Sequence, residues 1–265
     1  MSATAASLDD CARPAHFTAE EWHVRVKLAQ CYRIFDHLGW SMIIFNHITA
    51  RLPGSEHHFL INPFGLRYDE VTASNLVKID IQGNPVGVNE PGVPQYRVNP
   101  AGFIIHSAIH GAVPAARWIM HTHTREGVAV ACKAHGLSNT NFYSAMIGDN
   151  VAYHDFEGLT VRDDERARLV DSIGHKPLVI LRNHGLLSHG RTAEEAFMRL
   201  YILQQACETQ VLCESMAGAD VPVSAASTSN STRDARLFGD DDLNGKDAFD
   251  ALVRIVDSQD ASYRS

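Results

Sequence analysis

The chain has 265 residues, of which 45% are hydrophobic and 20% charged, a balance typical of a globular protein with a large core. The formal net charge of -8 argues against nucleic acid or an anionic membrane surface as the main partner. The five cysteines form no C-x-x-C pair, and the sequence shows neither a secretory signal nor a run of about 18 apolar residues. We therefore expect a cytoplasmic protein that neither spans a membrane nor binds nucleic acid.

The first predicted helix follows a flexible N-terminal arm over residues 1–17. Thr18 and Glu21 have the spacing of a capping box, apolar residues then recur at helical intervals, and Gly39 supplies a stop. Three short apolar runs follow, and Gly and Pro separate them as they separate antiparallel strands. These predicted strands lie within residues 42–51, 57–65 and 75–81.

The second half of the chain alternates predicted helices and strands. The predicted helices are 101–111, 125–136 and about 163–173. A longer helix is predicted to begin at the capping box of Thr192 and Glu195 and to end near Ala217. The predicted strands are 116–123, 150–156 and 176–183. Together these elements indicate one α/β domain over residues 18–217. The extension at 218–265 is expected to hold a flexible linker at 221–245, rich in Ser, Thr and Asp, and a short helix at 246–258.

Two histidines one residue apart, His121 and His123, end the predicted strand at 116–123. Because strand side chains alternate between faces, the two imidazoles point the same way and can bind one cation. A catalytic zinc site commonly uses three protein ligands and leaves a fourth position open. His184 is the candidate for the third ligand, because it follows an apolar strand and precedes Gly185, where a tight turn would expose it. The alternative is a chance pair in a chain with 15 histidines.

A rival metal site lies in the predicted helix at 101–111. His106 and His110 are four residues apart, which is the ligand spacing of the zincin metalloproteases. In a zincin the residue after the first histidine is the glutamate that acts as general base, and here it is Ser107. Peptide hydrolysis by that route therefore lacks its base, and buried structural histidines are the simpler interpretation.

Three long segments resemble the class II aldolase/adducin family: "NHITARLPGSEHHFLINPFGLRYDEVTASNLVKID", "VNPAGFIIHSAIHGAVPAARWIMHTHT" and "LVILRNHGLLSHG". The resemblance runs from about residue 20 to 217 and is closest to adducin heads and adducin-like bacterial proteins. It implies a three-layer α/β/α fold with a central, mostly antiparallel sheet flanked by helices. It also implies a divalent metal, most often Zn2+ with Mn2+, Co2+ or Fe2+ as alternatives, held by His121, His123 and His184. Family members are typically homotetramers with sites at subunit interfaces.

The sequence departs from the sugar-phosphate aldolases of this family at one functional stretch. Those enzymes carry Ser-Ser-Glu just before the helix that here contains His106, the serines binding phosphate and the glutamate moving the proton. The corresponding residues here are Pro100, Ala101 and Gly102. Proline has no N–H, and Ala and Gly have no side-chain donor, so we expect a substrate without a phosphate. Another group must also replace the glutamate.

Candidate substrate and proton-transfer residues follow from the same patterns. A substrate carboxylate could pair with Arg51, whose alternative interpretation is a solvated residue at a strand end. Glu126 lies one turn beyond His123, or is an exposed carboxylate near a helix start. The predicted proton carriers are His106, Glu126 and Tyr143. The predicted substrate-binding residues are Arg51, Asn62, Phe64 and Gly65 of the "INPFG" loop, and Gly102.

These features predict a metal-dependent carbon–carbon lyase, an aldolase or a decarboxylase. The expected substrate is a small non-phosphorylated keto, hydroxy or aromatic carboxylate that the metal chelates and polarises. Decarboxylation is compatible with the absence of the glutamate, because loss of CO2 requires an electron sink but no base for a C–H proton. Two alternatives remain open: a non-catalytic, adducin-like assembly protein, and an iron-dependent oxygenase on the same three histidines.

Overall fold

The computed structural model describes residues 13–54, 57–87, 96–159, 162, 164–235 and 245–265. Most of the expected N-terminal arm therefore lies outside the described residues. Phe17, the last residue of the predicted arm, is instead buried and stacks on Trp22 of the first helix. None of the helices in the described part of the chain is long and apolar enough to cross a membrane.

A seven-stranded sheet runs through the middle of the fold in the order β3-β2-β1-β4-β7-β6-β5. Every neighbouring pair is antiparallel except β5 and β6, which are parallel, so the expected mostly antiparallel sheet is confirmed. The strands are β1 (His47–Arg51), β2 (Phe59–Ile61), β3 (Val77–Ile79), β4 (Trp118–Thr122), β5 (Val151–His154), β6 (Leu178–Leu181) and β7 (Gly185–Gly190).

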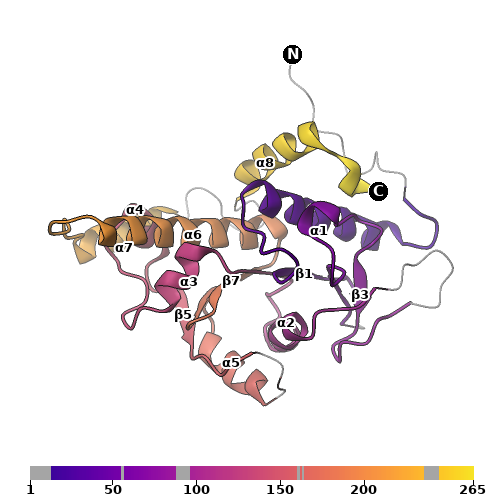
Figure 1. Cartoon of the computed structure of the whole chain (residues 1–265), viewed down its shortest axis with the longest axis horizontal. Helices are drawn as coiled ribbons and strands as arrows, with labels where there is room; N and C mark the ends of the chain where they lie inside the picture. Colours follow the sequence, from indigo (N-terminus) through magenta and orange to yellow (C-terminus); the bar gives the residue numbers. More distant parts are fainter. Residues whose placement is uncertain (1–12, 55–56, 88–95, 160–161, 163, 236–244) are drawn as a thin grey trace.

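Helices cover both faces of the sheet and complete the three layers (Figure 1). One face packs on α1 (Ala19–His37), α3 (Arg125–Ala131) and α6 (Ala193–Ser215), and α8 (Lys246–Gln259) packs on α1 and α6 outside this layer. The other face packs on α2 (Pro100–Ala112) and α5 (Glu165–Ile173). Strand alternation separates the two cores: in β4, Met120 belongs to the first apolar cluster and its neighbour Ile119 to the second.

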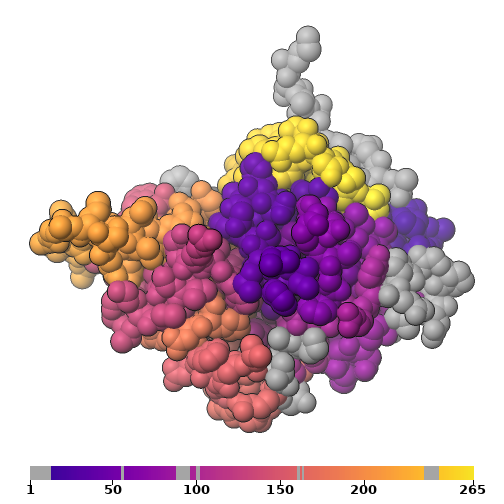
Figure 2. Space-filling model, in the orientation of Figure 1, coloured from indigo at the N-terminus to yellow at the C-terminus, as the bar shows by residue number. Residues whose placement is uncertain are grey.

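The predicted helix starts at Thr18 and Thr192 are confirmed, because each side chain accepts the N–H of the residue three positions on. Two α-helices in the described part of the chain were not predicted. One is α4 (Phe142–Ile147), and the other is α7 (Ala225–Asp234), which lies in the segment expected to be a flexible linker. Ser224 caps α7, and Thr232 donates to Ala145 O of α4 at 2.9 Å, so tertiary contact stabilises this polar helix. Figure 2 shows α7, in orange, projecting from the main body.

A buried tyrosine joins the first helix to the sheet near the start of β1. The Tyr32 hydroxyl donates to Ile48 O at 2.5 Å and accepts the N–H groups of Ile48 and Asn62 at 2.9 and 3.2 Å. These groups are buried away from water, so each depends on the hydroxyl for its hydrogen bond. Tyr32 therefore fixes the position of β1 and of the loop after β2 against α1.

Replacing Tyr32 with Phe should lower the free energy of unfolding by about 1–3 kcal/mol, because it leaves buried backbone groups unpaired. Tyr68 is the matched control: its ring lies 4.7 Å from that of Tyr32, it is equally buried, and its hydroxyl has no hydrogen-bond partner in the described part of the chain. Tyr68→Phe should be neutral or slightly stabilising. Urea unfolding of both variants tests this, and equal losses would contradict the assigned role of Tyr32.

Candidate metal centre

Three histidine side chains converge at one end of the central strands. His121 lies in β4, His123 follows directly after β4, and His184 lies in the turn between β6 and β7. The three can each offer a ring nitrogen within 4.8 Å of the others, and the Nε2 atoms of His121 and His123 are 2.7 Å apart. Within the described residues, this is the one group of three or more His, Cys, Asp or Glu side chains close enough to share a metal ion.

The turn that carries His184 is held tightly against β4. Leu181 pairs with Gly185, so three residues connect β6 to β7, and Asn183 in their middle has a φ of 55°. A Cβ atom on Gly185 would lie 2.3 Å from the backbone oxygen of Thr122 and 3.1 Å from the His123 ring. Only glycine allows this approach, which brings the turn beside the two strand histidines.

Hydrogen bonds fix which nitrogen each strand histidine presents. Nδ1–H of His121 donates to Leu186 O at 2.8 Å, so its Nε2 carries the lone pair. Nδ1 of His123 lies 3.2 Å from Met42 Sδ, a weak acceptor, and its Nε2 faces Nε2 of His121. Burial lowers the pKa values of His121 and His123 and lowers that of His184 to about 4. Neutral imidazoles with convergent lone pairs fit a divalent metal such as zinc.

The structure adds a buried histidine that the sequence left unassigned. His47 pairs with His121 across β1 and β4, and its ring centroid lies 5.2 Å from that of His121 and 4.3 Å from that of His106. Neither ring nitrogen of His47 makes a hydrogen bond of standard geometry within the described part of the chain. A Cβ on Gly102 would lie 2.8 Å from the His47 ring, so the missing side chain at residue 102 provides the space for this imidazole.

In the described structure His106 and His110 both hydrogen-bond to the Thr49 hydroxyl and do not form a second candidate metal site. Nδ1 of His106 and Nε2 of His110 lie 2.7 and 2.8 Å from Thr49 Oγ1, and Nδ1 of His110 lies 2.8 Å from Ala116 O. Because a carbonyl only accepts, His110 donates to Ala116, Thr49 donates to His110, and His106 donates to Thr49. Nε2 of His106 is therefore an acceptor, and it is buried without a partner among the described residues.

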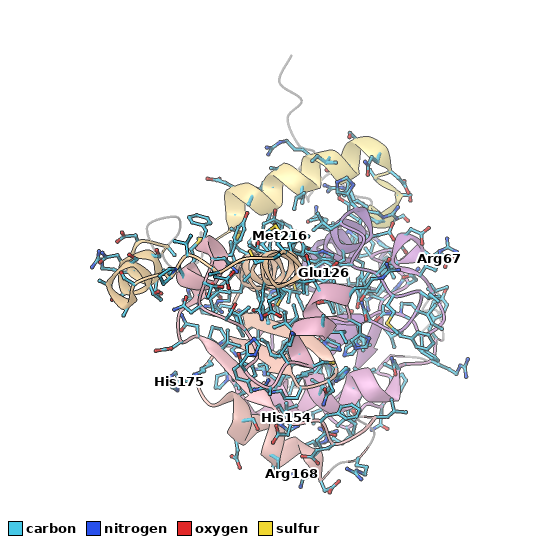
Figure 3. All side chains as sticks on the ribbon, turned by 60° about the vertical axis from the view of Figure 1, so that its left-hand side comes forward. Arg67, Glu126, His154, Arg168, His175 and Met216 are labelled. Atoms are coloured by element: carbon cyan, nitrogen blue, oxygen red, sulfur yellow. The ribbon has the colours of Figure 1, made fainter. Side chains whose placement is uncertain are left out.

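The predicted proton carriers occupy different places. The ring of His106 contacts that of His47, which in turn contacts the ring of His121. Glu126 is half-buried in the first turn of α3 (Figure 3), and its charge acts on Cys207 of α6. Tyr143 is in α4, which packs mainly against α6 and α7, and its ring packs on the first apolar cluster.

The predicted substrate residues divide between the two ends of β1. Arg51 lies four residues beyond His47, ~13 Å along the strand, and burial together with the charge of Arg117 lowers its pKa. Asn62 follows β2 and lies at the His47 end of β1, because Ile61 pairs with Thr49. The Asn62 side chain is buried against the Tyr32 hydroxyl, with its Oδ1 3.0 Å away.

The remaining loop residues continue from Asn62 at the same end of the sheet. Phe64 is half-buried, its N–H donates to Arg97 O at 2.8 Å, and the Arg97 guanidinium lies 5.9 Å from its ring centre. Gly65 is exposed with a φ of 107° and has open space where a Cβ would lie. The "INPFG" loop therefore borders the end of the sheet that carries the histidines, whereas Arg51 does not.

Comparisons with known proteins agree with this fold. Residues 26–211 match the model of the Class II Aldolase and Adducin N-terminal domain family. The crystal structure of an aldolase II superfamily protein from Pseudomonas syringae is similar at 39% identity with a TM-score of 0.86, covering 94% of this chain and 98% of that one.

Two further relatives carry specific names. An L-fuculose 1-phosphate aldolase from Glaciozyma antarctica is 28% identical with a TM-score of 0.80, covering 96% of this chain and 97% of that one. Alpha-adducin of Mus musculus is 46% identical over 196 residues, which are 74% of this chain and 26% of alpha-adducin. The extent of the family match and these identities show that the chain belongs to the class II aldolase and adducin family.

Proposed function

We propose that the protein is a divalent-metal-dependent carbon–carbon lyase that acts on a small, non-phosphorylated keto, hydroxy or aromatic carboxylate. The observation that carries this proposal is the convergence of His121, His123 and His184 with one side toward solvent. His121 is buried, but His123 and His184 are partly exposed, so a small molecule has access to the group. When bound, the metal would supply a Lewis acid for a chelated carboxylate and its neighbouring oxygen.

Two segments of the chain, 100–102 and 40–50, offer no cationic side chain to a phosphate. Pro100, Ala101 and Gly102 stand where the sugar-phosphate aldolases have Ser-Ser-Glu, and residues 40–50 contain no Lys or Arg. Phosphate recognition normally uses backbone N–H groups, hydroxyls or cations. The name of the Glaciozyma antarctica relative includes a sugar phosphate, but these positions argue that this chain takes a different substrate.

His47 and the histidines behind it are the groups of this chain that stand in for the missing carboxylate. The space left by Gly102 is filled by the neutral imidazole of His47, and behind it His106 presents an acceptor at Nε2. A neutral, buried site of this kind suits decarboxylation, which does not require a carboxylate base. Glu126 and Tyr143 remain proposed proton carriers. Because α4 packs away from β1, Tyr143 would act in a neighbouring subunit of a homotetramer.

A non-catalytic assembly role is the second candidate, and the 46% identity with alpha-adducin supports it. The chain spans 26% of alpha-adducin, so a role of the whole adducin molecule does not transfer directly. The partial exposure of His123 and His184 favours the enzyme, since a scaffold has no need of an accessible metal. Zinc is the metal that the three imidazoles suit best, with Mn2+, Co2+ and Fe2+ as alternatives.

Replacing His184 with Ala should remove one of three ligands and lower metal affinity by more than ~100-fold. After dialysis, the wild-type protein should retain about one ion per chain by plasma emission spectrometry and the variant almost none. His175 is exposed on the surface (Figure 3), so His175→Ala is the control and should keep its metal. Retention of the metal in His184→Ala would contradict the ligand assignment.

Replacing Gly185 with Ala should also reduce metal binding, although residue 185 contributes no ligand. The added methyl would lie 2.3 Å from Thr122 O, so the turn must move away from β4 and carry His184 with it. Gly111→Ala is the matched control in α2, because a Cβ there meets only Ile81 Cδ1 at 3.7 Å. We expect Gly111→Ala to leave metal content unchanged and stability equal or higher. Equal metal content in the two variants would contradict the close-approach role of Gly185.

Metal-loaded protein should cleave at least one member of a panel of 2-keto, 2-hydroxy and aromatic carboxylic acids, with release of CO2 or an aldehyde. The same protein should not cleave the phosphorylated sugars. His184→Ala should lower kcat/KM by at least about 100-fold, while His175→Ala should leave it unchanged. Stoichiometric metal without turnover of any acid on the panel would count against the lyase and in favour of the adducin-like role.

A further inference from the structure

A buried histidine and a buried glutamate face each other between β5 and α5. His154 is the last residue of β5, and Glu165 is the first residue of α5 (Figure 3). Their exposed fractions are 5% and 4%, and Nε2 of His154 lies 3.3 Å from Oε1 of Glu165. Burying a carboxylate costs free energy unless it is paired, and the proposed function gives neither residue a role.

The contact between these two side chains contains a proton. Ser172 donates its hydroxyl hydrogen to Arg168 O at 2.7 Å, so its oxygen accepts Nδ1–H of His154 at 3.0 Å. Nε2 of His154 then either donates a second proton to the carboxylate or accepts the proton of a neutral Glu165. In both forms the hydrogen bond keeps the glutamate side chain in place.

The pair lies beside the turn that carries His184. His154 pairs with Leu181 in the β5–β6 ladder, and His154 O accepts the N–H of Arg182 at 2.8 Å. His184 follows two residues later, and its backbone N–H donates to Leu181 O at 3.0 Å. One small cavity is lined by His154, Glu165 and His184 together with apolar side chains of α2, α5 and β6.

The cavity is about the size of one water molecule. Its volume is about 10 Å³, close to the smallest that holds an ordered water. Three carboxylate side chains of the described residues line it, and two of them are unsuited to a buried water. Asp155 is exposed, and Glu157 accepts Nε–H of Arg168 at 2.7 Å. Glu165 is the buried carboxylate of the three, so a water in this cavity would donate to it.

The ring of His184 differs from those of the other two candidate ligands. Nδ1 of His121 donates to Leu186 O, and Nδ1 of His123 lies beside Met42 Sδ. The described residues provide no such hydrogen bond to the ring of His184. A histidine that binds a metal through one nitrogen presents N–H at the other, and a carboxylate, a carbonyl or a water normally accepts it. His184 therefore requires an acceptor, and the cavity lies beside it.

We propose that Glu165 is a positioning residue for the metal centre and holds His184 through one water molecule in this cavity. The water accepts the ring N–H of His184 and donates to the Glu165 carboxylate, which His154 fixes in place. This inference rests on the proposed function, because it requires a metal on His121, His123 and His184. Glu165 touches neither metal nor substrate. It strengthens metal binding because it orients the ligand ring and makes its metal-facing nitrogen more basic.

Glu165→Gln tests this role with little change of shape. The glutamine amide can donate to Nε2 of His154, so the buried ring keeps a partner, but the negative charge that polarises the water is lost. We expect Zn2+ affinity, measured by competition with a chromophoric chelator, to fall about tenfold. The visible absorption bands of the Co2+-loaded protein should also shift, because the ligand field of His184 changes.

Glu195→Gln is the matched control. Glu195 is also a carboxylate 4% exposed in the first turn of a helix, and it accepts the N–H of Arg191, which follows the end of β7 opposite to His184. Its ion pair with Arg199 stabilises the fold, so loss of the charge should lower the melting temperature. Zn2+ affinity and the Co2+ bands should stay as in the wild type.

A crystal structure of the zinc-loaded wild-type protein tests the inference without a variant. One water should lie within about 3.2 Å of both a ring nitrogen of His184 and a carboxylate oxygen of Glu165. An empty cavity overturns the inference and leaves the metal centre intact. The same holds for wild-type Zn2+ affinity and Co2+ bands in Glu165→Gln, or for equal losses of affinity in Glu165→Gln and Glu195→Gln. Wild-type protein that binds no metal overturns the proposed function as well.

Discussion

The close approach of β7 to the end of β4 is the constraint on which the candidate site depends. Gly185 leaves no space between the turn and Thr122 O, and Leu186 O then accepts the hydrogen bond that orients His121. The ligands thus come from backbone segments that hydrogen-bond to one another. A site built on paired strands holds its side chains more precisely than one built on free loops.

The alternation of side chains along β1 determines which residues surround the three histidines. In β1, His47 and Thr49 face α2, whereas Ile48 and Ala50 face the core formed with α1 and α6. One face of β1 therefore carries His47 and Thr49, of which Thr49 hydrogen-bonds to the histidines of α2, and the other face packs in the apolar core. Because burial lowers the pKa of His47 to about 3, this imidazole is neutral and adds no charge beside His121.

Local signals in the sequence predicted the elements that local interactions form. The helix caps at Thr18 and Thr192 need only a side chain and an N–H three residues away, and both were found. The shared face of His121 and His123 follows from strand alternation alone. His47 could not be assigned, because its place beside His121 depends on the register of β1 against β4, which no short sequence pattern specifies. The helix α7 was missed for the same reason, since its polar sequence is stabilised by contact with α4.

Membership in this family determines the fold that brings the three histidines together more closely than it determines the residues around them. The three histidines belong to strands and a turn that the whole fold supports, and the relatives share that fold. Residue 102 lies in α2, where a side chain can change without disturbing a strand. In this chain it is a glycine, and the space beside it holds the imidazole of His47. A buried, neutral ring therefore lies beside His121 where a side chain at residue 102 would otherwise project.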